Sequence, residues 1–352
     1  MTDKSDNGTL DQMRSVVAEH LDPRWGSAFW LDRAEQAGVR TAEEITGLSD
    51  LVSRLSMGPA DLRARPLLHY VPRRYHDQRH RFVIGQTGGT TGPGAWTVYL
   101  PVEFHEAFVE PFTRAATHTG FPEGETWLYV GPTGPHLIGK AASAIARCVG
   151  SCEPFFLDFD PRWSRKMPAE SAGATRYLQH VLDQAMDVIE QQRIGVLFAT
   201  PPVLMGLAKR MTPKQREQVR GVHYGGMAIN AATLEELQVR AFPVAVHLSG
   251  YGNTLFGCCP ELRTTERRHH DYYPFGTRLR IEVVDEKGRP ASVGRVRFTR
   301  LDHGSMIVGM LERDHAQVAQ LPAHAPAGFV LPGVRDPHTP ATAHQPAVAT
   351  LY

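Results

Sequence analysis

The sequence predicts an α/β protein, and three changes of pattern along its 352 residues carry that prediction. From about residue 80 to 250, short apolar runs alternate with helical segments, which is typical of doubly wound parallel sheets. After about residue 265, strands with alternating polarity are joined by the turn residues 285–288, which indicates an antiparallel unit. Before about residue 75, the apolar residues follow helical spacing. We therefore expect two doubly wound αβ sheets, a small antiparallel β subdomain and a helical leader.

These changes divide the chain into four parts. We expect a helical leader packed on the core at residues 1–75, an αβ core at 76–265, the β subdomain at 266–321 and a tail rich in Pro, Ala and His at 322–352. The tail has little apolar periodicity, which is typical of an extended strap.

The leader has the pattern of several short helices. Residues 11–20 form an amphipathic stretch, and residues 27–37 keep helical apolar spacing up to Gly38, which suits a helix C-cap. Thr41 and Glu44 match a capping box that would open another helix.

The αβ core alternates strand and helix, and its short apolar strands suit a sheet that is buried on both faces. We expect strands at 81–85, 96–100, 126–130, 155–159, 195–199, 222–224 and 244–248. We expect helices at 101–120, 139–149, 177–191, 201–211, 212–219 and 233–241. In the β subdomain we expect strands at 278–284, 294–300 and 306–311.

Composition and charge argue against several classes of protein. The chain has 38 basic and 37 acidic side chains, so its net charge of +1 offers no electrostatic footprint for nucleic acid or an anionic membrane. Its first residues lack the basic and apolar regions of a signal peptide, and the longest nearly apolar run, 194–208, is short and contains two prolines. Four cysteines do not make a disulfide framework in this length. We expect a cytoplasmic protein with no nucleic-acid or membrane partner.

A loop rich in glycine and threonine follows the first expected strand. Its glycines allow a tight turn that directs successive N–H groups inward, and its hydroxyls add donors, so it is suited to wrapping a phosphate. It is not a Walker A loop, because the Gly-Lys-Ser/Thr ending is missing. A flexible surface turn is the alternative interpretation. The residues concerned are Thr87, Gly88, Gly89, Thr90, Thr91 and Gly92.

Two more loops follow expected strands, at the strand ends where ligands bind in open α/β sheets. In His223–Met227, two glycines would admit a planar ring against the backbone, and a simple strand-to-helix turn is the alternative. In Ser249–Thr254, Tyr251 would stack on a base and Thr254 would bind a phosphate oxygen. A buried tyrosine in a tight turn is the alternative there.

The order and spacing of these three loops resemble those of the adenylate-forming superfamily, which contains acyl-CoA ligases, peptide-synthetase adenylation domains and luciferases. Members carry a Ser/Thr/Gly loop, a GGE-like turn, a YGxTE motif and an aspartate that holds the ribose. The matching residues are Thr87–Gly92, Gly225–Met227, Tyr251–Leu255 and Asp314. The first 75 residues, His136 and the segment 194–207 resemble the phenylacetate-CoA ligase branch.

The resemblance implies the fold of an adenylate-forming N-terminal domain, with a core that binds ATP or AMP, Mg²⁺ and an acyl group. The residues implied to hold adenine and ribose are Gly225, Tyr251 and Asp314. Those implied to hold phosphate are Thr90, Thr91 and Thr254. Those implied to face the acyl substrate are His136 and Lys140. The nucleotide site would be completed by Gly226, Met227, Gly252 and the hinge-like Arg335.

The chain departs from the family pattern at three points. Leu255 stands where the YGxTE glutamate helps to hold magnesium, and leucine has no oxygen donor for a hard cation. The loop lysine of the family is missing, because Pro93 and Gly94 follow the loop. The sequence ends 16 residues after the hinge-like Asp336, so we expect the C-terminal lid and its lysine to be absent. Charge neutralisation would then depend on Thr90, Thr91, Thr254, His136 and Lys140.

A lidless member of this branch resembles the truncated adenylating proteins of phenazine antibiotic (griseoluteate-type) biosynthesis. That resemblance implies ATP-dependent adenylation of an aromatic, phenazine-like carboxylate, with a reductase or acyl acceptor protein downstream. A homodimer is a separate expectation. The alternative is a catalytically degenerate protein that binds nucleotide or aryl acid as a partner or carrier for another enzyme. A third interpretation is that the same binding site carries out ATP-independent chemistry on an aromatic ligand.

One further cluster has the composition of a metal site. Cys258 and Cys259 with His269 and His270 could ligate zinc, which accepts mixed Cys and His ligands. Adjacent cysteines are awkward for one tetrahedral site, and the resemblance makes this stretch a loop. We therefore assign no metal-binding residue.

Overall fold

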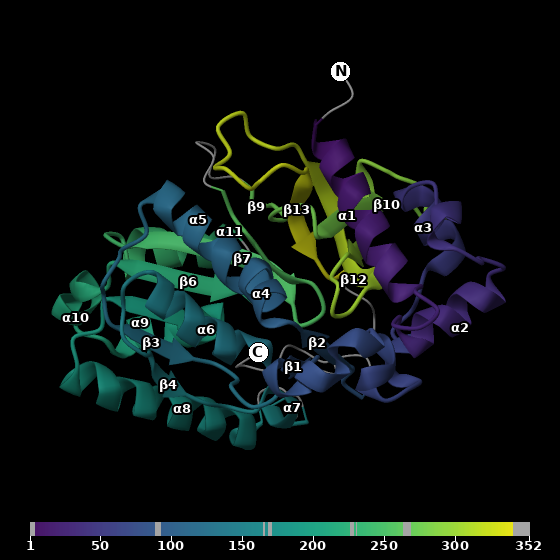
Figure 1. Cartoon of the computed structure of the whole chain (residues 1–352). Coiled ribbons are helices and arrows are strands. Elements are labelled where there is room, and N and C mark those ends of the chain that lie inside the picture. Colours follow the sequence, from purple (N-terminus) through teal and green to yellow (C-terminus); the bar gives the residue numbers. More distant parts are fainter. Residues whose placement is uncertain are drawn as a thin grey trace.

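The computed structural model describes residues 4–88, 93–164, 166–167, 171–225, 229, 231–262 and 269–340. Three sheets organise them: a mainly parallel sheet, an antiparallel sheet and a two-stranded hairpin (Figure 1). The predicted α/β class, with a parallel sheet and a separate antiparallel unit, is confirmed.

Six strands form the αβ core, in the order β4–β3–β5–β6–β7–β8. All neighbours are parallel except β7 and β8, which are antiparallel. The central strands are buried on both faces, which accounts for their unbroken apolar sequences. The bounds are β3 Trp127–Val130, β4 Phe155–Leu157, β5 Val196–Ala199, β6 Gly221–Gly225, β7 Val246–Asn253 and β8 Gly257–Pro260.

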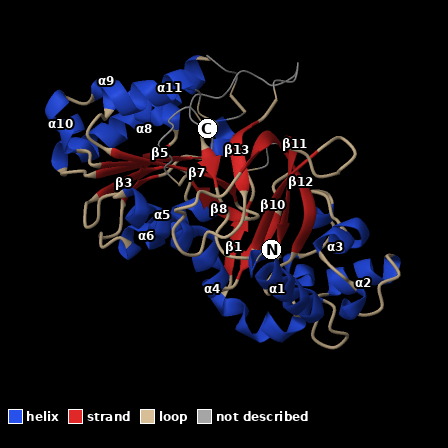
Figure 2. Cartoon of the chain, turned by 90° about the horizontal axis from the view of Figure 1, so that it is seen from above, coloured by secondary structure: helices blue, strands red, loops and turns tan. Residues whose placement is uncertain are grey.

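Helices cover both faces of this sheet, and Figure 2 shows α5 and α6 on one face and α8, α9 and α11 on the other. Each face has its own core of buried apolar side chains. The helices between β2 Trp96–Tyr99 and β4 are α4 Pro101–Phe104, the π-helical η5 His105–Val109, α5 Glu110–Thr119 and α6 Leu137–Cys148. Those that follow β4 are α7 Pro161–Ser164, α8 Ala172–Gln191, α9 Pro201–Arg210, α10 Pro213–Gln218, α11 Ala231–Glu235 and the π-helical η6 Glu236–Ala241. No helix within the described ranges has the length and apolar character needed to cross a bilayer.

The strand order changes direction between β3 and β5. After β3 the chain crosses to the edge strand β4, and after β5 it crosses to β6 on the other side. The loops at the carboxyl ends of β3 and β5 therefore diverge, and ligands bind at such switch points in open α/β sheets.

The antiparallel sheet has the order β10–β11–β12–β13–β9 and shares a hydrophobic core with the helical leader. Met13, Trp30 and Leu51 of the leader belong to the same core as Phe298 and Ile307 of the sheet. The strands are β9 Asp271–Tyr272, β10 Leu279–Val284, β11 Val293–Arg300, β12 Ile307–Ala319 and β13 Gly333–His338. The leader contains α1 Lys4–His20, α2 Ala28–Gln36, α3 Leu48–Leu55 and the 3₁₀ helices η1 Ala42–Glu44, η2 Asp61–Arg63, η3 Leu67–Tyr70 and η4 Arg73–Arg81.

Two features differ from the expected organisation. One sheet rather than two is doubly wound among the described residues, because β1 Val83–Gln86 and β2 Trp96–Tyr99 pair antiparallel with each other. A short loop joins them directly, whereas parallel neighbours need a longer crossover. The second difference is β13, which lies in the expected tail and pairs with both β12 and β9. The four domain boundaries stay predictions.

Candidate active site

A cavity of about 350 Å³ lies at the carboxyl end of the parallel sheet. The loops after β3 and β5 line it at the switch point, and the ends of β6 and β7, the base of the β1–β2 loop and part of β12 also contribute. This volume lies within the range of small-molecule sites.

Two of the expected nucleotide residues contact each other in the cavity wall. The Tyr251 hydroxyl donates a hydrogen bond to one oxygen of Asp314 over 3.1 Å, and Thr339 donates to the other oxygen over 2.6 Å. Burial and the charge of Asp314 raise the pKa of Tyr251 well above its usual value, so the phenol stays protonated and donates. Asp314 is thus held at the cavity with lone pairs left to accept from a ligand hydroxyl.

Gly225 and Gly252 line the cavity with bare backbone. Gly225 ends β6, and a Cβ there would lie 2.8 Å from the carbonyl oxygen of Gly250 on β7. A Cβ at position 252 would clash with the backbone of Gly257. Glycine is therefore required for the close approach of the strands, and it leaves a flat surface that suits a planar ring.

The base of the Gly/Thr loop also lines the cavity. The Thr87 N–H donates to the Ala95 carbonyl and its Oγ1 accepts from the Ala95 N–H, each over 2.9 Å. Thr254 Oγ1 donates to the Gln86 carbonyl over 3.4 Å, so Thr254 lies beside the loop base with Thr87 and Gly88. The remaining expected residues lie outside the described part of the chain: Gly89, Thr90, Thr91, Gly92, Gly226 and Met227.

Another part of the cavity wall is aromatic and apolar. Phe108, Tyr129 and Phe198 line it together with Leu137. The Tyr129 hydroxyl donates to the Pro132 carbonyl over 3.0 Å. Aromatic surface of this kind suits a flat apolar ligand.

The two residues expected to face the acyl substrate are placed differently. His136 is buried at the N-terminus of α6 and lines the cavity. Lys140 lies one turn further along α6, is exposed and is not among the lining residues. Its Nζ donates to the Ile84 carbonyl over 3.0 Å. The structure therefore brings His136, but not Lys140, to the cavity.

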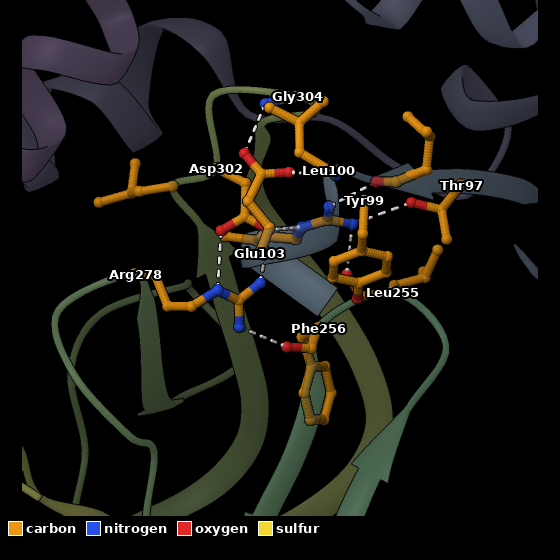
Figure 3. Close-up of polar contacts among 12 residues, drawn as sticks. Thr97, Tyr99, Leu100, Glu103, Leu255, Phe256, Arg278, Asp302 and Gly304 are labelled. Atoms are coloured by element: carbon orange, nitrogen blue, oxygen red, sulfur yellow. Dashed lines mark hydrogen bonds and ion pairs between the residues drawn. The ribbon is translucent and has the colours of Figure 1, made fainter. Parts of the chain in front are cut away.

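A buried ionic cluster is centred on Asp302 (Figure 3). Asp302 accepts two hydrogen bonds from Arg278, at 2.8 and 2.6 Å, and one from Arg300 at 2.5 Å. Burial alone would raise the pKa of Asp302, but the two guanidinium groups outweigh it and hold the pKa below its usual value. The cluster is thus ionised, and removal of Asp302 would leave two buried guanidinium groups without their carboxylate.

The arginines of this cluster also fix the backbone that follows β7. Arg300 Nη1 donates to the Leu255 carbonyl over 3.1 Å, and Arg278 Nη1 donates to the Phe256 carbonyl over 3.0 Å (Figure 3). Leu255 itself lines the cavity.

Tyr99 extends this arrangement by one residue. Its hydroxyl donates to the Thr254 carbonyl over 2.9 Å, and the Arg300 guanidinium lies 3.6 Å from the centroid of its ring. Three successive carbonyl groups, those of residues 254–256, are therefore held by buried side chains, which fixes Thr254 at the cavity.

Glu103 is a buried acid of the same region (Figure 3). Its carboxylate accepts from the Leu100 N–H over 2.8 Å and from the Gly304 N–H over 2.7 Å. Burial and the charge of Asp302 raise the pKa of Glu103 to about 7. Its protonation therefore changes near neutral pH.

The residues at the cavity do not fit a magnesium ion held at position 255. Leu255 presents an apolar side chain there, and Mg²⁺ takes oxygen ligands. Within the described ranges, no group of three or more His, Cys, Asp or Glu side chains is placed to hold a metal ion.

The residues considered for zinc have other surroundings. His269 and His270 each pair with a carboxylate, at 2.6 and 3.2 Å. Burial raises the pKa of Cys258 to about 12 and that of Cys259 well above its usual value. Cys258 lines the cavity and Cys259 is buried in the core.

Arg335 is not among the residues that line the cavity. Its guanidinium makes two bonds of 2.7 Å to Asp271, on the neighbouring strand β9. Its predicted role in nucleotide binding therefore has no support from its position.

The sequence analysis did not identify three features of the site: the bond from Thr339 to Asp314, the side chain of Arg63, and the rings of Tyr129 and Phe198. Thr339 lies in the expected tail, where no motif marked it. Arg63 comes from the leader, and only the fold brings it to the loop base, where its Nη1 donates to the Pro93 carbonyl over 3.3 Å. A signal did exist for Tyr129 and Phe198, because both lie near the carboxyl ends of expected strands.

The fold is that of the N-terminal domain of adenylate-forming enzymes. The chain is similar to 2-hydroxyisobutyryl-CoA ligase in complex with 2-HIB-AMP and CoA in the thioesterification state, with a TM-score of 0.64 and 16% identity over 94% of this chain and 66% of that one. An open conformation of that ligase gives a TM-score of 0.66 and 15% identity over 95% and 74%. The chain thus spans about two thirds to three quarters of those structures. No protein-family profile matches it, and no curated protein sequence does.

Proposed function

We propose that the chain activates an aromatic carboxylic acid with ATP, forming an acyl-AMP. One observation carries the proposal: a single cavity is lined by the Tyr251–Asp314 pair and the Thr87 loop base, and also by the aromatic rings of Phe108 and Phe198. The polar wall suits a nucleotide, and the aromatic wall suits a planar acid.

In this reaction a carboxylate oxygen attacks the α-phosphorus of ATP, and pyrophosphate leaves as its bond to that phosphorus breaks. The protein has to align two anions and neutralise charge, and it need not supply a nucleophile. Asp314 would accept hydrogen bonds from the ribose hydroxyls, Gly225 would make room for adenine, and Thr254 would donate to a phosphate oxygen.

Arg63 would provide positive charge at the phosphates. It lines the cavity and donates to the carbonyl of Pro93, directly after the Gly/Thr loop. A guanidinium is permanently charged and pairs well with phosphate oxygens. Mg²⁺ enters the proposal only as the counter-ion that ATP carries into the site.

The substrate class is the finer part of the proposal. The aromatic wall supports a planar aryl acid, and we extend this to a phenazine-like acid of secondary metabolism. A reductase or an acyl acceptor protein would then consume the acyl-AMP, because a mixed anhydride is a reactive intermediate that needs an acceptor.

The test is ATP–pyrophosphate exchange with Mg²⁺ over a panel of aryl and phenazine carboxylates. We expect exchange with at least one aryl acid, and none with short aliphatic acids. Absence of exchange with every acid, under conditions where AMP binds, would refute adenylation by this chain.

A second candidate function is that of a binding protein for nucleotide or aryl acid, acting as partner or carrier for another enzyme. The apolar Leu255 side chain at the cavity favours it, because no carboxylate stands there to organise Mg²⁺ and the phosphates. Binding of AMP and of an aryl acid without exchange would support this candidate.

A further inference from the structure

His223 lies in the cavity wall among aromatic rings. It is on β6 and only 3% exposed, and its ring centroid is 4.2 Å from that of Phe198 and 4.8 Å from that of Phe112. A polar ring in such surroundings must satisfy its nitrogens locally or through a ligand.

One of its two nitrogens has a defined role. Nδ1 lies 2.7 Å from the Leu248 carbonyl oxygen, and a carbonyl only accepts, so Nδ1 carries the proton. Burial lowers the pKa of His223 to about 4, so the ring is neutral at physiological pH. Its Nε2 is therefore a hydrogen-bond acceptor.

Nε2 is available to a ligand. Nε2 has no hydrogen-bond partner among the described residues. It is also absent from the fully buried, unpartnered polar atoms of those residues, so a ligand atom can reach it. Since the ring lines the cavity, Nε2 opens into it. The Tyr129 hydroxyl, in the same wall, already donates to the Pro132 carbonyl.

We propose that His223 is a specificity-determining residue, and that the acid bound here carries a hydroxyl or amino donor on its aromatic ring, received by His223 Nε2. This inference rests on the proposed function for the identity of the ligand as an aryl acid. A site built around a buried hydrogen bond discriminates against an analogue without the donor, because that analogue leaves the acceptor unpaired.

The experiment measures equilibrium binding of matched acids by calorimetry, so that it does not depend on turnover. The pairs are the three hydroxybenzoates and three aminobenzoates against their methoxy and methyl counterparts. We expect at least one donor-bearing isomer to bind about 10- to 100-fold more tightly than its counterpart. Equal binding within every pair, or binding of none of these acids, would overturn the proposal.

Variants assign the preference to the side chain. His223→Phe keeps a ring between Phe112 and Phe198 but removes the acceptor, so the preference should fall to about threefold or less. His223→Gln places an amide oxygen near the position of Nε2 and should restore part of the preference for donor-bearing acids. This variant also provides the test if His223→Phe fails to fold. His247→Phe is the matched control, because His247 is a buried histidine outside the cavity wall, bonded to the Phe242 carbonyl at 3.1 Å. A preference that persists in both His223 variants without change would overturn the assignment.

The two proposals fail separately. Discrimination at His223 without pyrophosphate exchange would refute adenylation and leave the specificity assignment standing. Exchange that is equally efficient with hydroxy and methoxy acids would refute the specificity assignment and leave adenylation standing.

Discussion

Arg300 and Leu255 are joined across the two main sheets: Arg300 Nη1 donates to the Leu255 carbonyl over 3.1 Å. Arg300 ends β11 of the antiparallel sheet and is fully buried, whereas Leu255 follows β7 of the parallel sheet and lines the cavity. The antiparallel sheet therefore helps to shape the cavity. The helical leader packs on that sheet in a shared hydrophobic core and so stabilises the sheet.

We expect Arg300→Lys to lower the free energy of unfolding by about 3 kcal/mol, because lysine cannot pair with Asp302 and hold the backbone carbonyls at the same time. Urea denaturation measures this loss. Arg289→Lys is the control, since Arg289 pairs with Asp285 at an exposed turn, where such pairs contribute about 0–1 kcal/mol. Similar losses in the two variants would contradict the role given to the cluster.

Glu103 makes stability depend on pH. Its pKa rises from 4.5 to about 7 on folding, so between these values the folded state holds a proton that the unfolded state has released. Its contribution to stability is therefore full below about pH 4.5 and is lost as the pH rises through 7. A pKa difference of this size between the unfolded and folded states corresponds to about 3 kcal/mol in the free energy of unfolding.

Urea denaturation of the wild type and Glu103→Gln from pH 4.5 to 8 measures this effect as the difference between the two proteins. The wild type should lose stability relative to the variant as the pH rises. The exposed Glu217→Gln serves as control and should follow the wild type in parallel. A difference for Glu103→Gln that does not vary with pH would show that the acid ionises normally.

Asp314→Ala should raise the dissociation constant of AMP about 10- to 100-fold, since a hydrogen bond to a charged group contributes about 1.5–3 kcal/mol. Calorimetric titration with AMP measures the change. Asp285→Ala, at an exposed turn, should bind AMP like the wild type. Unchanged affinity in Asp314→Ala would place the ribose elsewhere.

Arg63→Gln should lower the rate of pyrophosphate exchange about 100-fold, because the charge it supplies is needed most as pyrophosphate leaves. The affinity for AMP should change much less, since AMP lacks the departing phosphates. Arg79→Gln is the control, because Arg79 is exposed on η4 and does not line the cavity. If Arg63→Gln weakened AMP binding as much as it slowed exchange, Arg63 would act in binding alone.

The parallel core could be predicted because each of its strands is a short apolar run between helical patterns. The convergence of Gly225, Tyr251 and Thr254 follows from the same pattern, since β6 and β7 are neighbours whose carboxyl ends lie together. The position of Asp314 at the same cavity was predicted from its match to the family motif, and no local periodicity indicated it.

The ionic cluster and β13 could not be predicted in this way. Arg278 and Arg300 flank strands of alternating polarity, where a charge normally faces solvent, and only the packing of the two sheets buries them. In β13, Arg335, Asp336 and His338 interrupt any apolar pattern, and the strand forms because both of its neighbours pair with it.

Isotope transfer tests the central claim most directly. An aryl acid that supports exchange is labelled with ¹⁸O in its carboxylate, and the acyl-AMP formed with ATP is trapped by hydroxylamine. If the carboxylate attacks the α-phosphorus, the released AMP carries one ¹⁸O atom, which mass spectrometry detects. AMP without label, or no AMP dependent on the acid, would contradict adenylation as the function of this cavity.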